Sequence, residues 1–367
     1  MHFTCSQSLL NEAISMSQRA ISPRSPQAIL EGLLFEAEDD TLTLTGYNLE
    51  TGIECKLDAD VLAPGRLVFD SRMIGDIVKK LPEDLVNFEV DDQLRVTIKS
   101  GLAEFKINGL QADDYPKIPL VEADKKIEIN QGKLKEMIQQ TIFAASKDDN
   151  RPMMSGIIFK ADGRQLELAA IDGFRIAIRR EELDADVEAT SFVVPAKALN
   201  ELQAILNNFT ESVKIYLSNN HILFESGIVK LVSRLTDGEF MDYNRIIPDT
   251  YNSQVFVETQ DILKAFERGN LISYPEGNRF PITVKSQSTN KLIISSKSHL
   301  GQVHDEINIE LQGDPLDSDF NPRYFLEALK NVPSEKVVMQ FSGTTGPCLI
   351  KPTEGNSFLF LVLPLRR

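Results

Sequence analysis

A short apolar segment recurs three times in this chain at nearly constant spacing. Leu33-Leu34-Phe35 is followed 124 residues later by Ile157-Ile158-Phe159 and, after another 125 residues, by Ile282-Thr283-Val284. Upstream of each segment, small and apolar residues recur at offsets that place them on one face of a helix. They are Leu10, Ala13, Ile14, Ser17, Ala20 and Ile21, then Leu134, Met137, Ile138, Thr141, Ala144 and Ala145, then Ile262, Ala265, Phe266 and Gly269. The repeat predicts one domain design used three times.

A second helix is predicted downstream of each segment. It opens at Asp70-Ser71, Pro195-Ala196 and Asn321-Pro322, and a strand signal follows near Val86, Val213 and Val337. The apolar positions of these helices are Ile74, Ile77, Val78 and Leu81, then Ala198, Leu202, Ile205 and Leu206, then Phe325, Ala328, Leu329 and Val332.

Between the helices the hydrophobic pattern changes to a period of two. Residues 41–45 and 165–169 alternate as half-buried strands do. Turn residues at 38–40 and 161–163 are expected to separate these strands from the apolar segments. Short connections favour antiparallel neighbours, so the predicted class is α+β, with helices on one side of antiparallel sheets.

The length of 367 residues accommodates three domains of about 120 residues, each large enough for its own core. Proline and acidic residues near 113–125 and 241–252 suit short linkers. The predicted domains are therefore residues 1–122, 123–250 and 251–367.

Composition points to the cytoplasm. No secretory signal and no membrane span are expected, because the amino end lacks an apolar run and no stretch reaches 18 apolar residues. Three cysteines, Cys5, Cys55 and Cys348, form neither a disulfide framework nor a metal motif. A reducing compartment fits them best.

The formal net charge of −15 argues on average against nucleic acid, because phosphate neutralisation needs Lys and Arg. A basic face can nevertheless sit on an acidic body. Lys79 and Lys80 lie off the apolar stripe of the first copy, and basic residues recur on the helices of the other copies. These residues are either solvated helix faces with ion pairs or parts of one basic lining.

Catalytic motifs are weak in this sequence. His299, His304, Asp305 and Glu306 fit no helix-borne metal motif and are better explained as solvated residues. Paired aspartates such as Asp39-Asp40 and Asp148-Asp149 invite a two-metal hydrolase hypothesis, but they lie at predicted turns, where aspartate is favoured. We expect no enzyme, no metal and no cofactor.

Several motifs in order resemble one family. Residues 170–176 (Ala-Ile-Asp-Gly-Phe-Arg-Ile) are similar to the T-D-G-H/Y-R-L segment of the bacterial DNA sliding clamp, the beta subunit of DNA polymerase III. Residues 192–197 resemble its V-V-P-x-K helix entry, 235–243 its L-I-D-G-x-F-P-D-Y, and 363–366 its terminal M-P-M-R. Phe174, Met241 and Arg367 depart from the pattern.

The resemblance implies the DNA-clamp fold: three repeated α+β domains per chain, in a head-to-tail homodimeric ring with antiparallel sheets outside and helices lining a hole around duplex DNA. Such a clamp tethers the replicative polymerase and confers processivity. Implied partners are the DNA polymerase III alpha subunit, the clamp-loader delta subunit, and other polymerases, ligase and mismatch-repair proteins, which dock by short peptides.

The resemblance also assigns site residues. The peptide pocket would comprise Met154, Ile171, Gly173, Phe174, Arg175, Ile176, Met241, Arg245, Ile246, Asn321, Tyr324, Leu361, Val362, Leu363, Pro364, Leu365 and Arg366. Arg24, Lys147, Arg151 and Lys197, with Lys79 and Lys80 from the helix pattern, would face DNA. Phe105 and Ile107 of the first domain would meet Leu271 and Ile272 of the third domain in the other subunit. The alternatives are a metal-dependent hydrolase and an acidic three-domain adaptor that binds only proteins.

Overall fold

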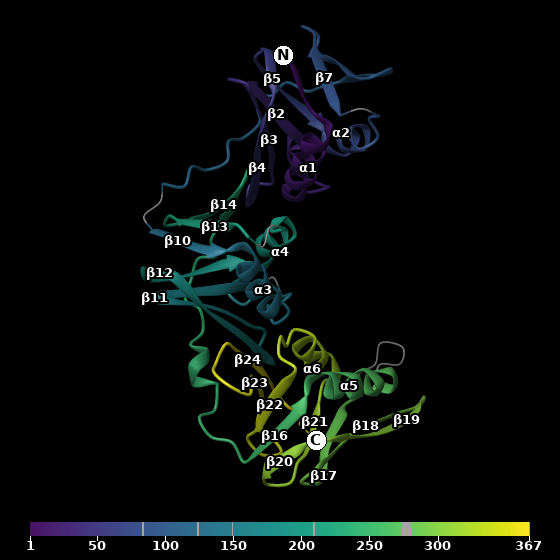
Figure 1. The fold of residues 1–367 in the computed structure, drawn as a ribbon, viewed down its shortest axis with the longest axis vertical. Coiled ribbons are helices and arrows are strands. Elements are labelled where there is room, and N and C mark those ends of the chain that lie inside the picture. The colour runs from purple at the N-terminus through teal and green to yellow at the C-terminus, as the bar shows by residue number, and fades with distance from the viewer. Residues whose placement is uncertain (83, 123–124, 149, 208–209, 274–279, 367) are drawn as a thin grey trace. The chain divides into compact units, whose positions relative to one another are not determined.

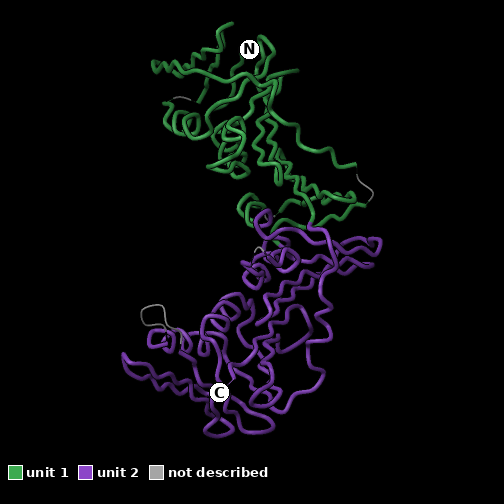
Figure 2. Tube along the Cα trace, turned by 180° about the vertical axis from the view of Figure 1, so that it is seen from behind, with its two compact units in different colours: residues 1–132, 200–235 green, residues 133–199, 236–367 purple. Residues whose placement is uncertain are grey.

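The computed structural model describes residues 1–82, 84–122, 125–148, 150–207, 210–273 and 280–366 (Figure 1). Its backbone contacts divide the chain into two compact units, drawn in green and purple in Figure 2. Unit 1 comprises residues 1–132 and 200–235, and unit 2 comprises residues 133–199 and 236–367. The middle third of the sequence is therefore shared between the units.

The first copy alternates strands and helices in the predicted order. Its elements are β1 (His2–Ser6), α1 (Gln7–Ser17), η1 (Gln18–Ala20), η2 (Ala28–Glu31), β2 (Gly32–Glu38), β3 (Thr41–Tyr47), β4 (Thr51–Asp58), β5 (Asp60–Ala63), β6 (Gly65–Asp70), α2 (Ser71–Val78), β7 (Leu85–Val90), β8 (Arg95–Ser100) and β9 (Ala103–Asn108).

The other two copies repeat this order with fewer or fused strands. The second contains β10 (Lys125–Asn130), α3 (Gln131–Ile142), β11 (Gly156–Ile171), β12 (Arg175–Pro195), α4 (Ala196–Ile205), β13 (Ser212–Leu217), β14 (His221–Ser226), β15 (Val229–Arg234) and η3 (Tyr243–Arg245). The third contains β16 (Ser253–Glu258), α5 (Thr259–Ser273), β17 (Ile282–Ser288), β18 (Lys291–Ser298), β19 (Gly301–Asn308), β20 (Glu310–Gly313), β21 (Asp317–Phe320), α6 (Pro322–Leu329), β22 (Lys336–Phe341), β23 (Cys348–Pro352) and β24 (Phe358–Val362).

The helices form where the periodicity predicts them. Leu10, Ala13, Ile14 and Ser17 form the buried face of α1, and the predicted positions of α5 are buried as well. Side chains cap the predicted starts of two second helices: Asp70 accepts a hydrogen bond from the Met73 backbone N–H at 2.7 Å, and Asn321 caps α6. Such caps satisfy backbone donors that the first helical turn leaves free.

Each copy also closes on itself in the same way. Its first strand pairs antiparallel with the strand that follows its second helix: β1 with β7, β10 with β13, and β16 with β22. Apolar residues oppose each other in these pairs, as Phe3 and Phe88 do in a stacked contact of 4.9 Å. The three-fold repeat of the sequence is therefore a repeat of strand pairing.

Two of the four sheets combine strands of consecutive copies. In unit 1, β15 of the second copy pairs with β4 of the first, giving the order β10-β13-β14-β15-β4-β3-β2-β6. In unit 2, β24 of the third copy pairs with β12 of the second, giving β11-β12-β24-β23-β22-β16-β20. The remaining sheets, β5-β1-β7-β8-β9 and β19-β18-β17-β21, end in the edge strands β9 and β19.

One predicted break does not occur. The turn expected at residues 161–163 is absent, because β11 runs through it and pairs with β12 on both sides. Gly163 has φ +56° and the register shifts around it, so the turn signal produces an irregularity within one long strand. Among the described residues no helix is long and apolar enough to cross a membrane.

Substitution of Gly46 tests the contact between α1 and β3. A Cβ at Gly46 would lie 2.0 Å from the Ser17 carbonyl oxygen, so Gly46→Ala must shift the helix against the sheet. We expect the free energy of unfolding to fall by about 1–3 kcal/mol or more, measured by urea unfolding. Gly163→Ala, where φ is +56° and nothing lies within 4 Å, gives the cost of backbone strain without a clash. An unchanged free energy of unfolding in Gly46→Ala would contradict this packing.

Candidate functional site

The predicted pocket residues divide into a buried floor and an exposed rim. Ile171, Ile176 and Leu361 belong to the hydrophobic core of unit 2, with Met154 and Leu363 partly buried against them. The other predicted apolar residues, Phe174, Met241, Ile246 and Leu365, form the exposed set that is called the rim here, and their side chains are 38–57% exposed. Exposed apolar residues around a core mark an interaction site more often than isolated ones do.

A tight turn between β11 and β12 places Phe174 on this rim. The Asp172 carboxylate accepts hydrogen bonds from the backbone N–H groups of Phe174 and Arg175, at 3.0 and 3.2 Å. Gly173 adopts φ +91°, a conformation that side chains rarely tolerate. The Phe174 ring then stacks on Tyr324 of α6, with centroids 5.9 Å apart.

Arg175 lies inside this region instead of on its surface. Its side chain is 5% exposed, and its Nε donates to Asp172 at 2.8 Å while its Nη1 donates to Glu327. The guanidinium carbon lies 4.6 Å from the Tyr324 ring centroid and 5.5 Å from that of Phe143. Through these contacts Arg175 joins the turn at Asp172 to Glu327 and Tyr324 of α6.

Glu327, which the sequence analysis missed, completes this network. Burial favours its neutral form, but hydrogen bonds from Arg175 and Arg323 outweigh burial, so the pKa of Glu327 lies below its ordinary value. The only available signal was the i,i+4 spacing of Arg323 and Glu327, whose side chains are 2.8 Å apart.

The tail after β24 forms one side of the rim. β24 ends at Val362, before Pro364, whose ring nitrogen has no hydrogen to donate to a ladder. The Leu363 N–H then donates to the Phe174 carbonyl at 2.9 Å, and the Leu365 N–H to that of Asp319 at 2.7 Å. Leu361 and Val362 are buried, Leu363 and Pro364 are half-buried, and Leu365 and Arg366 are exposed.

The other predicted pocket residues have separate positions. Asn321 serves as the α6 N-cap. Arg245 is exposed, and its Nε lies 3.0 Å from Asp242. Tyr243, which was not predicted, is fully buried under this linker and donates to Glu167; burial and that carboxylate raise its pKa.

One of the predicted dimer residues, Phe105, lines an apolar pocket. In unit 1, a cavity of about 510 Å³ is lined by Met73, Ile77 and Phe105, with Asp70, Arg72, Asp76 and Lys80 around it. Ile77 was expected in the core, but only Ile74 and Val78 of α2 are buried, because one face of this helix lines the cavity. In unit 2, Leu271 is 75% exposed at the end of α5, beside half-buried Ile272.

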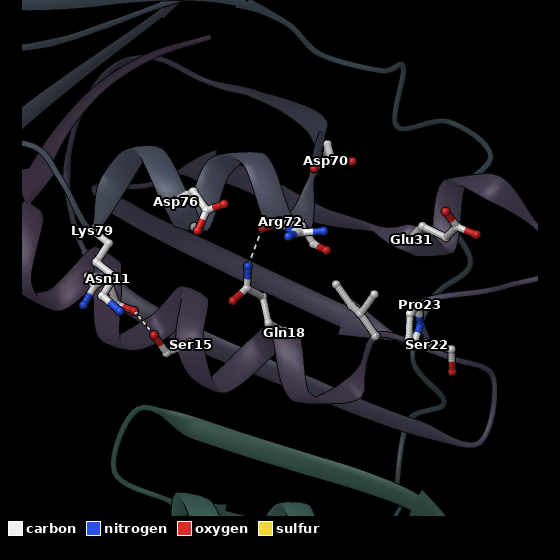
Figure 3. Close-up of a pocket in the computed structure, with 13 residues that line it drawn as sticks. Asn11, Ser15, Gln18, Ser22, Pro23, Glu31, Asp70, Arg72, Asp76 and Lys79 are labelled. Atoms are coloured by element: carbon white, nitrogen blue, oxygen red, sulfur yellow. Dashed lines mark hydrogen bonds between the residues drawn. The ribbon is translucent and has the colours of Figure 1, made fainter.

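The predicted DNA-facing residues are all exposed, in both units. In unit 1, Lys79 and Arg72 line a polar pocket of about 560 Å³ between α1 and α2 (Figure 3). Asp70, Asp76 and Glu31 line it too, and Arg24 directly follows its residue Pro23. Lys80 lines the apolar pocket described above.

In unit 2, Lys147 and Arg151 lie in the segment before β11, and Lys197 lies on α4. Arg151 is 3.6 Å from Asp148, and a Cβ at Gly173 would lie 3.8 Å from its Nη1. A residue predicted to face DNA is thus close to the turn of the predicted peptide pocket.

Metal-binding geometry is not found in the described part of the chain. No group of three or more His, Cys, Asp and Glu there could hold an ion. His304 contacts Glu306 at 3.2 Å on the exposed strand β19, while the His299 ring lies 6.1 Å from Phe280.

Comparisons with known proteins agree over the whole length. Models of the N-terminal, central and C-terminal domains of the DNA polymerase III beta subunit match residues 1–119, 128–242 and 244–366. The beta sliding clamp of Bacillus subtilis is 33% identical over 100% of both chains, and that of Staphylococcus epidermidis is 32% identical over 100% of this chain and 99% of its own.

Solved structures are similar as well. The Bacillus subtilis DNA polymerase sliding clamp has a TM-score of 0.97 at 33% identity and covers 100% of this chain and 99% of its own. The Pseudomonas aeruginosa sliding clamp bound to griselimycin has 0.94 at 27% identity, with full coverage of both chains. The chain therefore belongs to the DNA polymerase III beta subunit family and is a sliding clamp, not an enzyme.

Proposed function

We propose that two copies of this chain close head to tail into a ring around duplex DNA. The observation that supports this proposal is the way consecutive repeats join within one chain. At both internal junctions, the last strand of one copy pairs with a strand of the preceding copy: β15 with β4 and β24 with β12. The equivalent strands at the two ends, β9 and β19, are sheet edges. Pairing them between two molecules would leave neither edge open.

The apolar pocket beside β9 supports this pairing. Met73, Ile77 and Phe105 offer an apolar surface of the kind that a buried anchor residue fills. Leu271 is an exposed apolar side chain on the helix that packs over β19. We propose that Leu271 and Ile272 of one subunit occupy this pocket in the other subunit, with Phe105 and Ile107 at the contact.

DNA would meet the exposed basic residues Arg24, Lys79, Lys80, Lys147, Arg151 and Lys197. None belongs to a base-reading motif, so binding should be independent of sequence and weakened by salt. A closed ring is retained by topology and needs little affinity, so a net charge of −15 is compatible with this function.

The region around Phe174 and Leu365 would bind short peptides of partner proteins. Its rim is apolar, and Met154 and Met241 add side chains that adapt to varied partners. We propose that the polymerase III alpha subunit, the clamp-loader delta subunit, other polymerases, ligase and mismatch-repair proteins dock here.

We also propose domains 1–122, 123–250 and 251–367, and a place in the cytoplasm at the nucleoid. The first boundary falls beside residues 123–124, outside the described ones.

Retention on circular DNA tests the central proposal. After loading, the chain should remain on a nicked circle and leave when the circle is cut, because only a closed ring is held by topology. Gel filtration of the complex before and after linearisation measures this. An acidic adaptor that binds only proteins would not be retained, and a chain retained equally on linear DNA would contradict encirclement.

Replacing Arg24, Lys147, Arg151 and Lys197 together with alanine should reduce loading onto DNA. It should also make DNA binding less dependent on salt concentration.

Alanine at both Leu271 and Ile272 should weaken the dimer. Losing two apolar anchors is expected to cost about 2–5 kcal/mol of association free energy. Sedimentation at nanomolar concentration measures the dimer fraction. Leu62→Ala, at another exposed leucine on a sheet edge, is the matched control. An unchanged dimer in the double variant would remove these residues from the interface.

Removing residues 363–367 should abolish binding of a Gln-x-x-Leu-Phe peptide and leave the dimer intact. Each buried apolar side chain contributes about 1.5–3 kcal/mol, so Leu365→Ala alone should weaken binding about tenfold or more. Calorimetric titration measures both effects, with Leu120→Ala, 92% exposed in unit 1, as control. A truncated chain that binds as tightly as the full chain would reject this pocket.

A further inference from the structure

The strand pairings between repeats within the chain also predict the register in which β9 of one subunit pairs with β19 of the other. The inference below rests on the proposed dimer and adds which residues of β9 and β19 lie opposite each other. A register matters because a slip of two residues keeps every side chain on its own face but changes all cross-strand pairs. The hairpins that contain these strands supply the alignment.

The strand β9 corresponds to β15. Each is the second strand of a hairpin with a two-residue turn: Ser100 pairs with Ala103, and Ser226 pairs with Val229. Both turns contain a glycine with φ +55°, Gly101 and Gly227. Ala103, Glu104 and Phe105 are therefore equivalent to Val229, Lys230 and Leu231.

The strand β19 corresponds to β4. Leu42 pairs with Leu57 and Leu44 with Cys55 in the first hairpin, and Leu292 pairs with Ile307 and Ile294 with Asp305 in the other. Leu42, Leu44, Leu292 and Ile294 are all completely buried, so the same face of each hairpin packs inward. Ile53, Glu54 and Cys55 are therefore equivalent to Val303, His304 and Asp305.

Within the chain, β15 and β4 pair Val229 with Cys55, Lys230 with Glu54, and Leu231 with Ile53. We infer that β9 of one subunit and β19 of the other subunit adopt this register. It places Ala103 opposite Asp305, Glu104 opposite His304, and Phe105 opposite Val303. The Phe105 side chain, which lines the apolar pocket, then faces an apolar neighbour.

Polar groups line the outer side of this seam. Inside the chain, Lys230 lies opposite Glu54, an oppositely charged pair. In the inferred register Glu104 lies opposite His304, and Lys106 lies opposite the uncharged Gln302. Glu104 also lies near Lys106 and Lys99, at 3.0 and 3.7 Å, and His304 lies near Glu306. The pairs named here therefore place no two like charges directly opposite each other.

Disulfide cross-linking distinguishes the register. The Lys56 N–H donates to the Ile228 carbonyl and the Arg234 N–H to that of Glu50, so the pair of Val229 and Cys55 falls between hydrogen-bonded pairs. Such sites bring Cα atoms to about 4.5 Å, which suits a disulfide. Ala103→Cys with Asp305→Cys should cross-link the full-length dimer under mild oxidation. The native cysteines are buried, and burial raises the pKa of Cys5 to about 12.

Ala103→Cys combined with Val303→Cys or Ile307→Cys represents the two slipped registers and should cross-link about tenfold more slowly. Faster cross-linking of either slipped pair, or none in a chain that sediments as a dimer, would overturn the register while leaving the dimer. A chain that sediments only as a monomer would overturn the proposed dimer itself.

Charge exchange gives an independent measurement. His304→Glu should weaken the dimer roughly fivefold by placing two carboxylates opposite each other, and adding Glu104→Lys should restore it. Glu38→Lys in the same background is the matched control, because it makes the same charge change at an exposed residue outside β9. Equal restoration by the control, or none by Glu104→Lys, would contradict the assignment.

Discussion

Antiparallel strand pairing joins consecutive repeats of this chain, and two of its sheets are built around that contact. The last strands of the second and third repeats, β15 and β24, pair with β4 and β12 of the preceding repeat. Backbone hydrogen bonds make this contact largely independent of side-chain identity, whereas the apolar alternation fixes the register. The corresponding strands β9 of the first repeat and β19 of the third lie at sheet edges.

The two internal junctions share a backbone frame but differ in their side chains. The Asn48 side chain accepts hydrogen bonds from the backbone N–H groups of Glu50 and Thr51, as Asp172 does from the residues at the same spacing. Leu49 (φ +73°) occupies the position of Gly173. The Arg234 N–H donates to the Glu50 carbonyl just as that of Leu363 donates to Phe174. At the first junction, charged residues therefore stand where the second carries an apolar rim.

A glycine contributes to the same difference. A Cβ at Gly52 would lie 2.5 Å from Cδ1 of Ile118, so the linker packs directly onto the strand there. The equivalent strand position in β12 carries the buried Ile176, and Ile246 of the second linker is 38% exposed. Repetition of the backbone with variation of a few side chains thus gives one junction an exposed apolar surface and closes the other.

The repeat, the α+β class, the helices and the strands that follow them could all be predicted from the amino-acid sequence, because hydrophobic periodicity and capping residues act over a few positions. The sequence also carried the motifs that identify the family. It did not determine that Arg175 is buried, since its partner Glu327 lies 152 residues away. Nor did it reveal that Ile77 lines a pocket, or that β11 continues through residues 161–163. Those features depend on which distant segments meet, because an apolar stripe or an arginine faces a neighbour instead of solvent only when a remote part of the chain folds against it.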